Sequence, residues 1–390
     1  MSIINDYINR RLTGSQLEDE LLGLIKEYNQ KSKTYLLVYS AAMEKPVPAV
    51  PLSMEDFYVI VDLLRGKDSG PLDFYIETPG GRGEAAEQIV EYLHSKFSEI
   101  NIVISGEAKS AGTIMALSGN KIVMSETGSL GPIDAQVRIG RGQVSAHDYM
   151  QWVKDKQTKA QKDKALNPFD ATMIAQISPG ELKGVENALE YAHDLVEKWL
   201  PKYKFRDWIK TQSTQKKVTE EMKRQRARKI AESLSDHSHW RSHGRSLKID
   251  DLESIGLKID RLDGKPELAL VIYKIQTVIK LLFSTTSSYK VFATEASKLF
   301  ISAIQVGPQP IVPEVANSAN LELECPKCKY KHKLYAKLKP DKVIDLEMQK
   351  QGFKKIPLTG KLVCEKCGFE LDLTGAKNEI ERAAKKPIIE

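Results

Sequence analysis

Cysteine is scarce in this chain of 390 residues, and all four cysteines lie beyond residue 324. A disulfide-stabilised secreted scaffold spreads cysteine through its sequence, so this distribution excludes that class and is typical of a reducing compartment. Charge of one sign is also not abundant. The formal net charge of +6 is mild for this length and does not by itself indicate a polyanionic partner.

Long apolar runs are missing as well. The strongest apolar stretch, Leu268 to Phe283, has 16 residues and contains Lys274 and Lys280, which predicts a segment too short to cross a bilayer. We expect it to pack between subunits or on the core. Charge follows the first residues at once, at Asp6, so no cleavable signal is visible. The sequence therefore predicts a cytoplasmic protein of about two to three structural units, with no membrane partner.

The most informative region starts at residue 72 and combines strands, helices and glycine turns. Leu72 to Thr78 alternates apolar and polar residues as a strand does, and Pro79-Gly80-Gly81 ends it with a turn that favours glycine. An amphipathic helix follows. Further strand patterns lie at Asn101 to Ser105 and Asn120 to Ser125. This alternation predicts an α/β fold with a largely parallel sheet and right-handed crossovers.

A serine lies where the second helix of this region begins. Ser110-Ala111-Gly112 precedes a short run of small and apolar residues. A serine nucleophile needs a base for its proton and fixed donors for the oxyanion, and the backbone N–H groups of Gly81 and Ala111 are the candidate donors. Taken alone, the serine can equally be a helix N-cap. The glycine turn one crossover earlier favours acyl transfer.

Three motifs in this region resemble one known family. T-P-G-G, S-A-G-T-x-x-A-L and L-G-P-I-D-x-Q look like the serine dehydrogenase proteinase family of the ClpP/crotonase superfamily, with signal peptide peptidase A a more distant relative. The resemblance covers approximately residues 15 to 300, since Leu36 to Tyr39, Leu189 to Leu200 and S-H-G-R at 242–245 also fit. It implies a repeated β-β-α superhelical core with a helical extension, a polypeptide substrate and a homo-oligomer.

The resemblance also implies a general base. The family carries a histidine at a fixed distance before an acidic helix ending in G-L, and His243 stands at that distance before Asp250 to Leu257. His237 matches a second, supporting histidine. With His239, these residues can also be read as an H-x-H-x3-H metal site. Among the other histidines, we expect His94 to be solvated, and nothing assigns chemistry to His147 or His193.

A carboxylate should orient the base, and Asp134 in Gly131-Pro132-Ile133-Asp134 is the candidate. An aspartate after proline often only caps a turn, and Asp170 and Asp236 are the alternatives. The signal peptide peptidase relatives use a lysine base instead. Lysines in the corresponding region lie in a mixed-charge stretch typical of a solvated helix face, at Lys159, Lys162 and Lys164.

The cysteines form a second motif, made of two C-x-x-C knuckles 35 residues apart. Cys325, Cys328, Cys364 and Cys367 can supply a tetrahedral thiolate set for zinc, and Gly368 lets the backbone turn toward the sulfurs. Four protein ligands leave no open position, so the predicted zinc is structural. Disulfides are the alternative. The long gap between the knuckles predicts a longer hairpin around Leu338 to Lys355.

These patterns divide the chain into segments. An amphipathic N-terminal helix is expected to pack on a neighbouring subunit, through its stripe Leu17, Leu21, Leu24, Ile25 and Tyr28. The predicted boundaries are 1–30 for that helix, 31–306 for the peptidase domain with a helical extension at 185–233, 307–320 for a proline-rich linker, 321–375 for the zinc ribbon and 376–390 for a charged tail. The basic stretch 202–229 suits nucleic acid or an acidic partner, but such runs are usually solvated helices.

The sequence thus predicts a serine endopeptidase. Ser110 attacks, His243 transfers the proton, Asp134 orients His243, and Gly81 and Ala111 hold the oxyanion. No nucleotide-binding loop is visible, so unfolding of substrates would require a separate ATPase or regulatory partner. Two other functions stay open. One is a degenerate or regulatory scaffold that binds nucleic acid or protein through the zinc ribbon and basic helix; the other is a crotonase-type acyl-thioester enzyme, which the serine and histidine pair disfavours.

Overall fold

The chain folds into two compact units, which are described separately. The computed structural model describes residues 2–133, 136–139, 142–211, 214–240, 242, 244–303, 318–384 and 386–389. Unit 1 comprises Met1–Ala303 and unit 2 comprises Ile304–Glu390. The N-terminal helices therefore belong to the same unit as the predicted peptidase domain. Most of the predicted linker lies outside the described residues.

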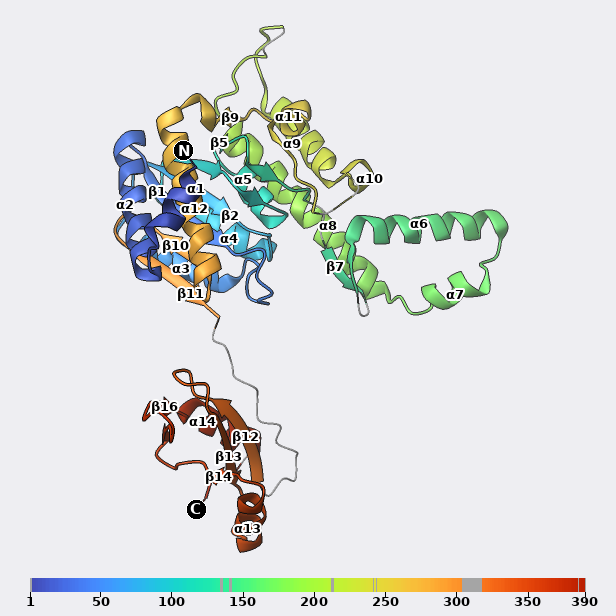
Figure 1. The fold of residues 1–390 in the computed structure, drawn as a ribbon. Coiled ribbons are helices and arrows are strands. Elements are labelled where there is room, and N and C mark those ends of the chain that lie inside the picture. Colours follow the sequence, from blue (N-terminus) through green and yellow to red (C-terminus); the bar gives the residue numbers. More distant parts are fainter. Residues whose placement is uncertain are drawn as a thin grey trace. The chain divides into compact units, whose positions relative to one another are not determined.

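Unit 1 is built on a seven-stranded sheet with the order β11-β10-β1-β2-β3-β5-β9 (Figure 1). Neighbouring strands from β1 to β9 pair in parallel, whereas β10 and β11 are antiparallel at one edge. The largely parallel sheet is thus confirmed, and the repeated β-β-α arrangement stays a prediction. The strands are β1 (Tyr35–Ala41), β2 (Pro71–Glu77), β3 (Glu99–Ile104), β5 (Lys121–Met124), β9 (Asp260–Arg261), β10 (Ser288–Ala293) and β11 (Lys298–Ser302).

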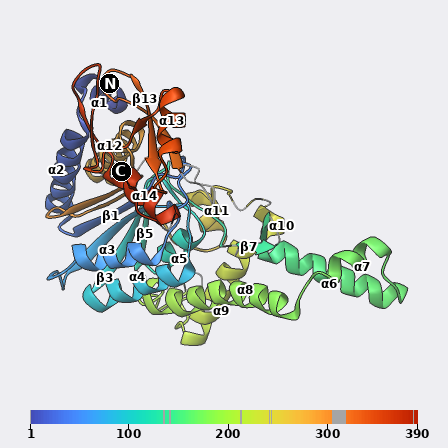
Figure 2. The same ribbon diagram turned by 90° about the horizontal axis from the view of Figure 1, so that it is seen from below.

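Helices cover both faces of this sheet, as the buried strands of a parallel sheet require (Figure 2). In β1, Leu36 and Val38 pack into the core shared with α1, α2 and α12, while Leu37 and Tyr39 pack into the core on the opposite face. The helices around the sheet are α1 (Ile3–Arg10), α2 (Gly14–Ser32), α3 (Met54–Leu63), α4 (Gly83–Lys96), α5 (Ala111–Leu117), α11 (Ile249–Ser254) and α12 (Pro266–Thr285).

The predicted N-terminal helix is two helices, because Arg11 adopts a left-handed conformation (φ 47°) and Thr13 caps α2. The apolar stripe of α2 is buried against α12 of the same chain, which corrects the expectation of a neighbouring subunit. Helix α12 corrects the expectation that the apolar stretch Leu268 to Phe283 is too short to cross a bilayer. At 20 residues it is long and apolar enough to cross a membrane by length and composition, and 44% of its most apolar window is buried in the protein.

Between β5 and β9 the chain makes a long, mostly helical excursion. It contains β6 (Ser129–Leu130), which pairs with β4 (Glu107–Ala108), and then the elements β7 (Gln136–Ile139), β8 (Gly142–Ser145), α6 (Ala146–Asp163), α7 (Pro168–Ile174), α8 (Pro179–Trp199), α9 (Glu220–Ser235) and α10 (His237–Trp240). Helices α6 and α7 project from the body in both views (Figures 1 and 2). The predicted helical extension starts earlier, at Pro179, and is interrupted between a π turn at Leu200–Lys204 and α9.

Unit 2 is a small α/β unit around the two knuckles. Its elements are β12 (Ser318–Glu324), β13 (Lys331–Lys337), α13 (Lys342–Lys350), β14 (Lys354–Lys355), β15 (Lys361–Val363), β16 (Glu370–Asp372) and α14 (Thr374–Ala384). The insertion between the knuckles holds helix α13, so the prediction of a hairpin around Leu338 to Lys355 is wrong. The segment predicted as a charged tail contains α14, whose Ile380 is fully buried in the core of this unit.

Candidate active site and cysteine cluster

Ser110 occupies a strained turn between β4 and α5. Its backbone has φ 48° and ψ −114°, a conformation that residues other than glycine rarely adopt and that costs about 1–3 kcal/mol. Its side chain makes no capping hydrogen bond to α5, and no described residue hydrogen-bonds to Ser110 Oγ. The alternative of a plain N-cap serine is therefore not what this turn shows. An exposed hydroxyl on a sharp strand-to-helix turn is the arrangement used for serine nucleophiles.

Gly80 makes this turn possible because the backbone of the glycine loop touches it. A Cβ on Gly80 would lie 2.7 Å from Lys109 O and 2.8 Å from Ser110 Cβ, and Gly80 has φ 93°. Both the contact and the conformation require glycine. The loop after β2 and the serine turn are thus locked together without side chains.

The neighbouring Gly81 is held by a segment that the sequence gave no reason to single out. Leu52 N donates to Gly80 O at 2.7 Å, and Arg82 N donates to Leu52 O at 2.9 Å. A buried ion pair fixes this segment from behind. Lys290 Nζ lies 2.7 Å from Asp56 Oδ2 and donates to Pro51 O at 3.0 Å. Burial raises the pKa of the Asp56 carboxyl, and the lysine opposes that shift.

Two backbone donors remain unused beside the serine. In the described part of the chain, neither Gly81 N nor Ala111 N donates to a backbone or side-chain acceptor. Both residues line the same cavity as Ser110. A pair of fixed, unpaired N–H groups next to a nucleophile is what an oxyanion hole requires.

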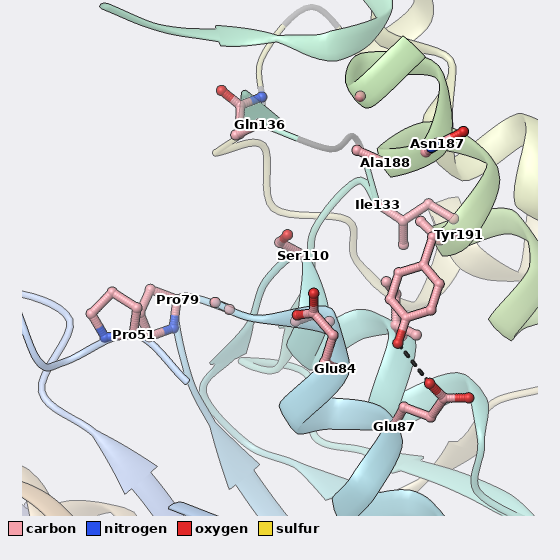
Figure 3. A pocket seen from close by; sticks show the side chains of 17 residues that line it. Pro51, Pro79, Glu84, Glu87, Ser110, Ile133, Gln136, Asn187, Ala188 and Tyr191 are labelled. Carbon is pink, nitrogen blue, oxygen red and sulfur yellow. Dashed lines mark hydrogen bonds between the residues drawn. The ribbon is translucent and has the colours of Figure 1, made fainter. Parts of the chain in front are cut away.

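The cavity over Ser110 has a volume of about 970 Å³ and lies between the glycine loop, α4 and α8 (Figure 3). Ser110 lies at its floor with Ala111 and Ile114 of α5. Glu84 and Glu87 of α4 form one side, and α8 closes the other with Asn187, Ala188, Tyr191 and Ala192. The site is a cleft large enough for a polypeptide side chain.

Asp134 lies outside the described residues, but the chain on both sides of it reaches this cavity. Ile133 and Gln136 line the cavity. The loop before Asp134 is fixed, since Thr113 Oγ1 donates to Gly131 O at 2.9 Å and Ile133 N donates to Leu234 O at 3.1 Å. Helix α5, which follows Ser110, and the loop before Asp134 are therefore connected through Thr113.

His243 also lies outside the described residues, and the chain after it is tied to the residue preceding Ser110. Lys109 Nζ donates to Ser246 Oγ at 2.9 Å and to Arg245 O at 3.2 Å. Leu247 forms an antiparallel bridge with Leu130. Lys109 was not a candidate from the sequence. Its burial lowers its pKa, which is the usual effect of removing an ammonium group from water.

The other histidines have structural surroundings. His94 corrects the expectation of a solvated side chain: it stacks on Tyr203 with ring centroids 3.4 Å apart, and Nε2 bonds to Ser118 O at 3.0 Å. Burial lowers its pKa to about 4. His193 bonds to Ser235 Oγ at 2.6 Å. The side chain of His237 is outside the described part of the structure, and His239 is exposed.

The alternative acids and bases do not line the Ser110 cavity. Asp170 is buried on α7 and pairs with Lys156 at 2.9 Å, while Asp236 lines a separate cavity beside His193. The lysines of the competing dyad are exposed at the end of α6, at Lys159, Lys162 and Lys164. In the basic stretch 202–229, Lys204 is half-buried, with its pKa lowered to about 8 by removal from water, and Lys223 Nζ donates to Arg206 O. Part of this basic charge is therefore used inside the fold.

The four cysteines of unit 2 converge on one point. Their Sγ atoms all lie within 4.8 Å of one another, with 3.6 Å between Cys325 and Cys367 and between Cys328 and Cys364. A tetrahedral ion with bonds of about 2.3 Å separates its thiolates by about 3.8 Å, whereas a disulfide needs about 2.05 Å. Lys329 and Gly368, which end the two knuckles, have φ 59° and 71°. The cluster can hold a metal ion and is not disulfide-bonded.

Comparisons with known proteins point to peptidases for the region around Ser110. Residues 51–219 match the family described as ClpP-like SDH-type serine proteinase. This range includes Ser110, Gly81 and Asp134; it excludes His243 and the cysteines. The match supports a peptidase family for this chain.

Relatives and solved structures add little about activity. Two uncharacterized proteins of Methanocaldococcus jannaschii are similar to this chain. MJ0137 is 29% identical over 44% of this chain, and MJ1495 is 26% identical over 54% of it. The chain spans 59% of the length of each. A mutant of the 1510-N membrane-bound stomatin-specific protease is similar at 13% identity and a TM-score of 0.32, over 56% of this chain and 76% of its own.

Proposed function

We propose that the protein is a serine endopeptidase with Ser110 as its nucleophile. The observation that carries this proposal is the Ser110 turn, in which a strained serine hydrogen-bonds through its side chain to no described residue. It lies in one cavity with two backbone N–H groups that are unpaired among the described residues. A structural serine gains nothing from such a conformation, whereas a nucleophile gains exposure of its hydroxyl. The match to a serine proteinase family over 51–219 supports the same function.

In the proposed reaction, Ser110 Oγ attacks the substrate carbonyl carbon and its proton passes to His243. The N–H groups of Gly81 and Ala111 donate to the oxyanion of the tetrahedral intermediate. His243 then protonates the leaving amine as the C–N bond breaks. Water, deprotonated by His243, hydrolyses the ester on Ser110. Asp134 holds the imidazole in the required tautomer and stabilises its cation.

The positions of the described neighbours support these roles. Ile133 and Gln136, on either side of Asp134, line the Ser110 cavity. Lys109 ties Arg245 and Ser246, just after His243, to the residue before the nucleophile. The ion held by the four cysteines is proposed to be structural zinc, because an all-thiolate tetrahedral set is typical of zinc and leaves no open position for water.

Labelling with a fluorophosphonate probe tests the nucleophile. We expect the full-length protein to form a covalent adduct on Ser110 and to cleave unfolded polypeptides. Ser110→Ala should abolish both, and His243→Ala should slow both by at least about 10³-fold. Asp134→Asn should lower the cleavage rate strongly while folding is unchanged by circular dichroism.

Ser118→Ala is the matched control, since Ser118 lies at the other end of α5 and outside the cavity. It should label like the wild type. A folded protein that cleaves peptides without any adduct on Ser110 would overturn the proposed nucleophile. A protein that neither labels nor cleaves but shifts RNA or DNA in a salt-dependent way would instead favour the scaffold function.

A further inference from the structure

The Ser110 cavity continues beyond the nucleophile into a space between α4 and α8. On α8, its wall is formed at Gly184, Asn187, Ala188, Tyr191 and Ala192, which share one face of the helix. Several of these residues are small. A Cβ on Gly184 would meet nothing within 4 Å, so this part of the wall leaves open room. The space is therefore wide enough to take a long side chain next to Ser110.

One end of this space is made rigid by Tyr191. Its hydroxyl donates to Glu87 Oε2 at 2.7 Å, and its ring lies so close to α4 that a Cβ on Gly83 would be 2.9 Å from Tyr191 Cε1. Glu87 also bonds to Lys198 at 3.3 Å. Glu87 therefore has a lysine partner, which it shares with Glu91, and a hydrogen bond from Tyr191, which serves as a fixed aromatic wall.

Glu84 differs from Glu87 because its charge is poorly compensated. Its ion-pair partner is Arg82 at 3.6 Å, and both side chains are 62% exposed. Such an exposed pair compensates the charge of Glu84 only weakly. In Figure 3 the Glu84 carboxylate points from the start of α4 toward the space between Ser110 and Tyr191. Among the described residues, no lysine or arginine lines the cavity.

The rest of the lining suits the stem of a basic side chain. Ile133 provides apolar surface beside the α8 wall (Figure 3), and Ile114 and Pro79 also line the cavity. Lysine and arginine bury their methylene stems against apolar surface while the charged end reaches a polar group. An acidic group in the wall of such a cavity selects a basic side chain, as the acidic residue of trypsin's specificity pocket does.

We propose that this cavity binds an arginine or lysine side chain of the polypeptide substrate, next to the scissile bond, and that Glu84 is the residue that determines this specificity. The inference rests on the proposed function. A competing explanation exists for Glu84, since an acidic residue in the first turn of a helix stabilises the helix dipole. The two explanations differ in what Glu84→Gln changes.

Paired fluorogenic peptides test the proposal on the full-length protein. The two peptides are identical except for arginine or citrulline at the residue before the scissile bond, because citrulline has the shape of arginine without its charge. We expect kcat/KM to be about tenfold higher for the arginine peptide, and Glu84→Gln to bring this ratio close to one. Glu84→Lys should reverse the preference.

Glu91→Gln is the control, since Glu91 lies two turns further along α4, has an ion-pair partner in Lys198 and does not line the cavity. It should keep the wild-type ratio. Ser110 labelling by the fluorophosphonate distinguishes failure of the specificity proposal from failure of the proposed peptidase function. A ratio near one in a wild-type protein that labels normally, or a tenfold ratio that survives Glu84→Gln, would overturn the specificity proposal alone. Loss of labelling in the wild type would overturn the proposed function and this inference together.

Discussion

The Ser110 turn of unit 1 and the cysteine cluster of unit 2 both hold a few side chains in a fixed arrangement, but by different means. Around Ser110 the backbone itself is positioned, through the contact with Gly80 and the hydrogen bonds to Leu52, all supported by a large apolar core. In unit 2 the core is small, and the four thiolates converge on one point. The first arrangement depends on packing and on buried charges. The second, by the proposal made above, depends on a bound metal ion.

Of the changes considered, removal of the metal ion should therefore produce the largest difference in stability between the two regions. The binding free energy of a structural thiolate site is about 10–16 kcal/mol, which exceeds what a core of this size supplies. We expect a strong chelator, or Cys325→Ser with Cys364→Ser, to abolish hydrogen-exchange protection of β12 and β13. Strand β2 should keep its protection, and Ser110 labelling should stay within about twofold of its starting rate.

Bound metal should be counted in the same samples, at one zinc per chain before chelation, with re-addition of zinc restoring protection. Amides of β12 and β13 that stay protected after complete metal loss would show that the apolar core of unit 2 is sufficient by itself. Loss of Ser110 labelling on chelation would show that the two regions are not independent.

The buried ion pair of unit 1 should give the next largest effect. Lys290→Met leaves Asp56 buried without its partner and frees Pro51 O, so we expect a loss of about 3–5 kcal/mol in the free energy of unfolding. The segment around Leu52 would then support Gly80 and Gly81 less firmly. Ser110 labelling should therefore be slower in this variant than in the wild type. The rate is measured under conditions in which urea denaturation shows the variant to be folded.

Lys298→Met is the matched control on the adjacent strand, because Lys298 pairs with Glu18 and Asp19 but is partly exposed. It should cost less than about 1 kcal/mol and leave labelling unchanged. The pair variant Lys290→Met with Asp56→Leu should regain part of the lost stability but not the labelling rate, since Ser53 N also loses its acceptor. Equal labelling in all variants would contradict a role for this pair in positioning the glycine loop.

Much of the nucleophile region could be predicted from the sequence because its signals are local. The strands at 72–78, 101–105 and 120–125, the glycine turn and the start of α5 at Ala111 all follow from periodicity and from glycine. The converging cysteines could likewise be predicted, since each knuckle contains its own turn. In both regions a few neighbouring residues determine the geometry.

What could not be predicted depends on contacts between distant segments. Asp56 and Lys290 are 234 positions apart, and neither lies in a motif. Lys109 looked like an ordinary lysine until its contact with Ser246 placed it beside the chain that carries His243. Helix α13 was predicted as part of a hairpin, because the spacing between the two knuckles gives the length of the insertion but not its secondary structure. His94 was expected to be solvated, because the sequence pattern of α4 gives no indication that Tyr203, more than 100 positions later, stacks on it.

His94 gives the smallest predicted effect and tests the contact at the far end of the nucleophile helix. Its Nε2–H donates to Ser118 O in the neutral form, and burial first, then the charges of Lys202 and Arg206, lower its pKa to about 4. Between pH 4 and the ordinary value near 6.5, the unfolded chain binds more protons at this site. The free energy of unfolding therefore rises with pH across this window, and the stabilisation is complete above it.

We expect wild-type protein to lose about 2 kcal/mol more than His94→Phe when the pH falls from 7.5 to 4.5, after allowance for partial solvent contact. Phenylalanine keeps the ring against Tyr203 but cannot titrate, so His193 and other groups cancel in the difference. Urea denaturation of both proteins at several pH values measures it. Parallel stability curves would contradict the lowered pKa. If His94→Phe also changed the rate of Ser110 labelling, helix α4 would contribute to the geometry of the Ser110 turn. The stability of unit 2 should not change with this substitution.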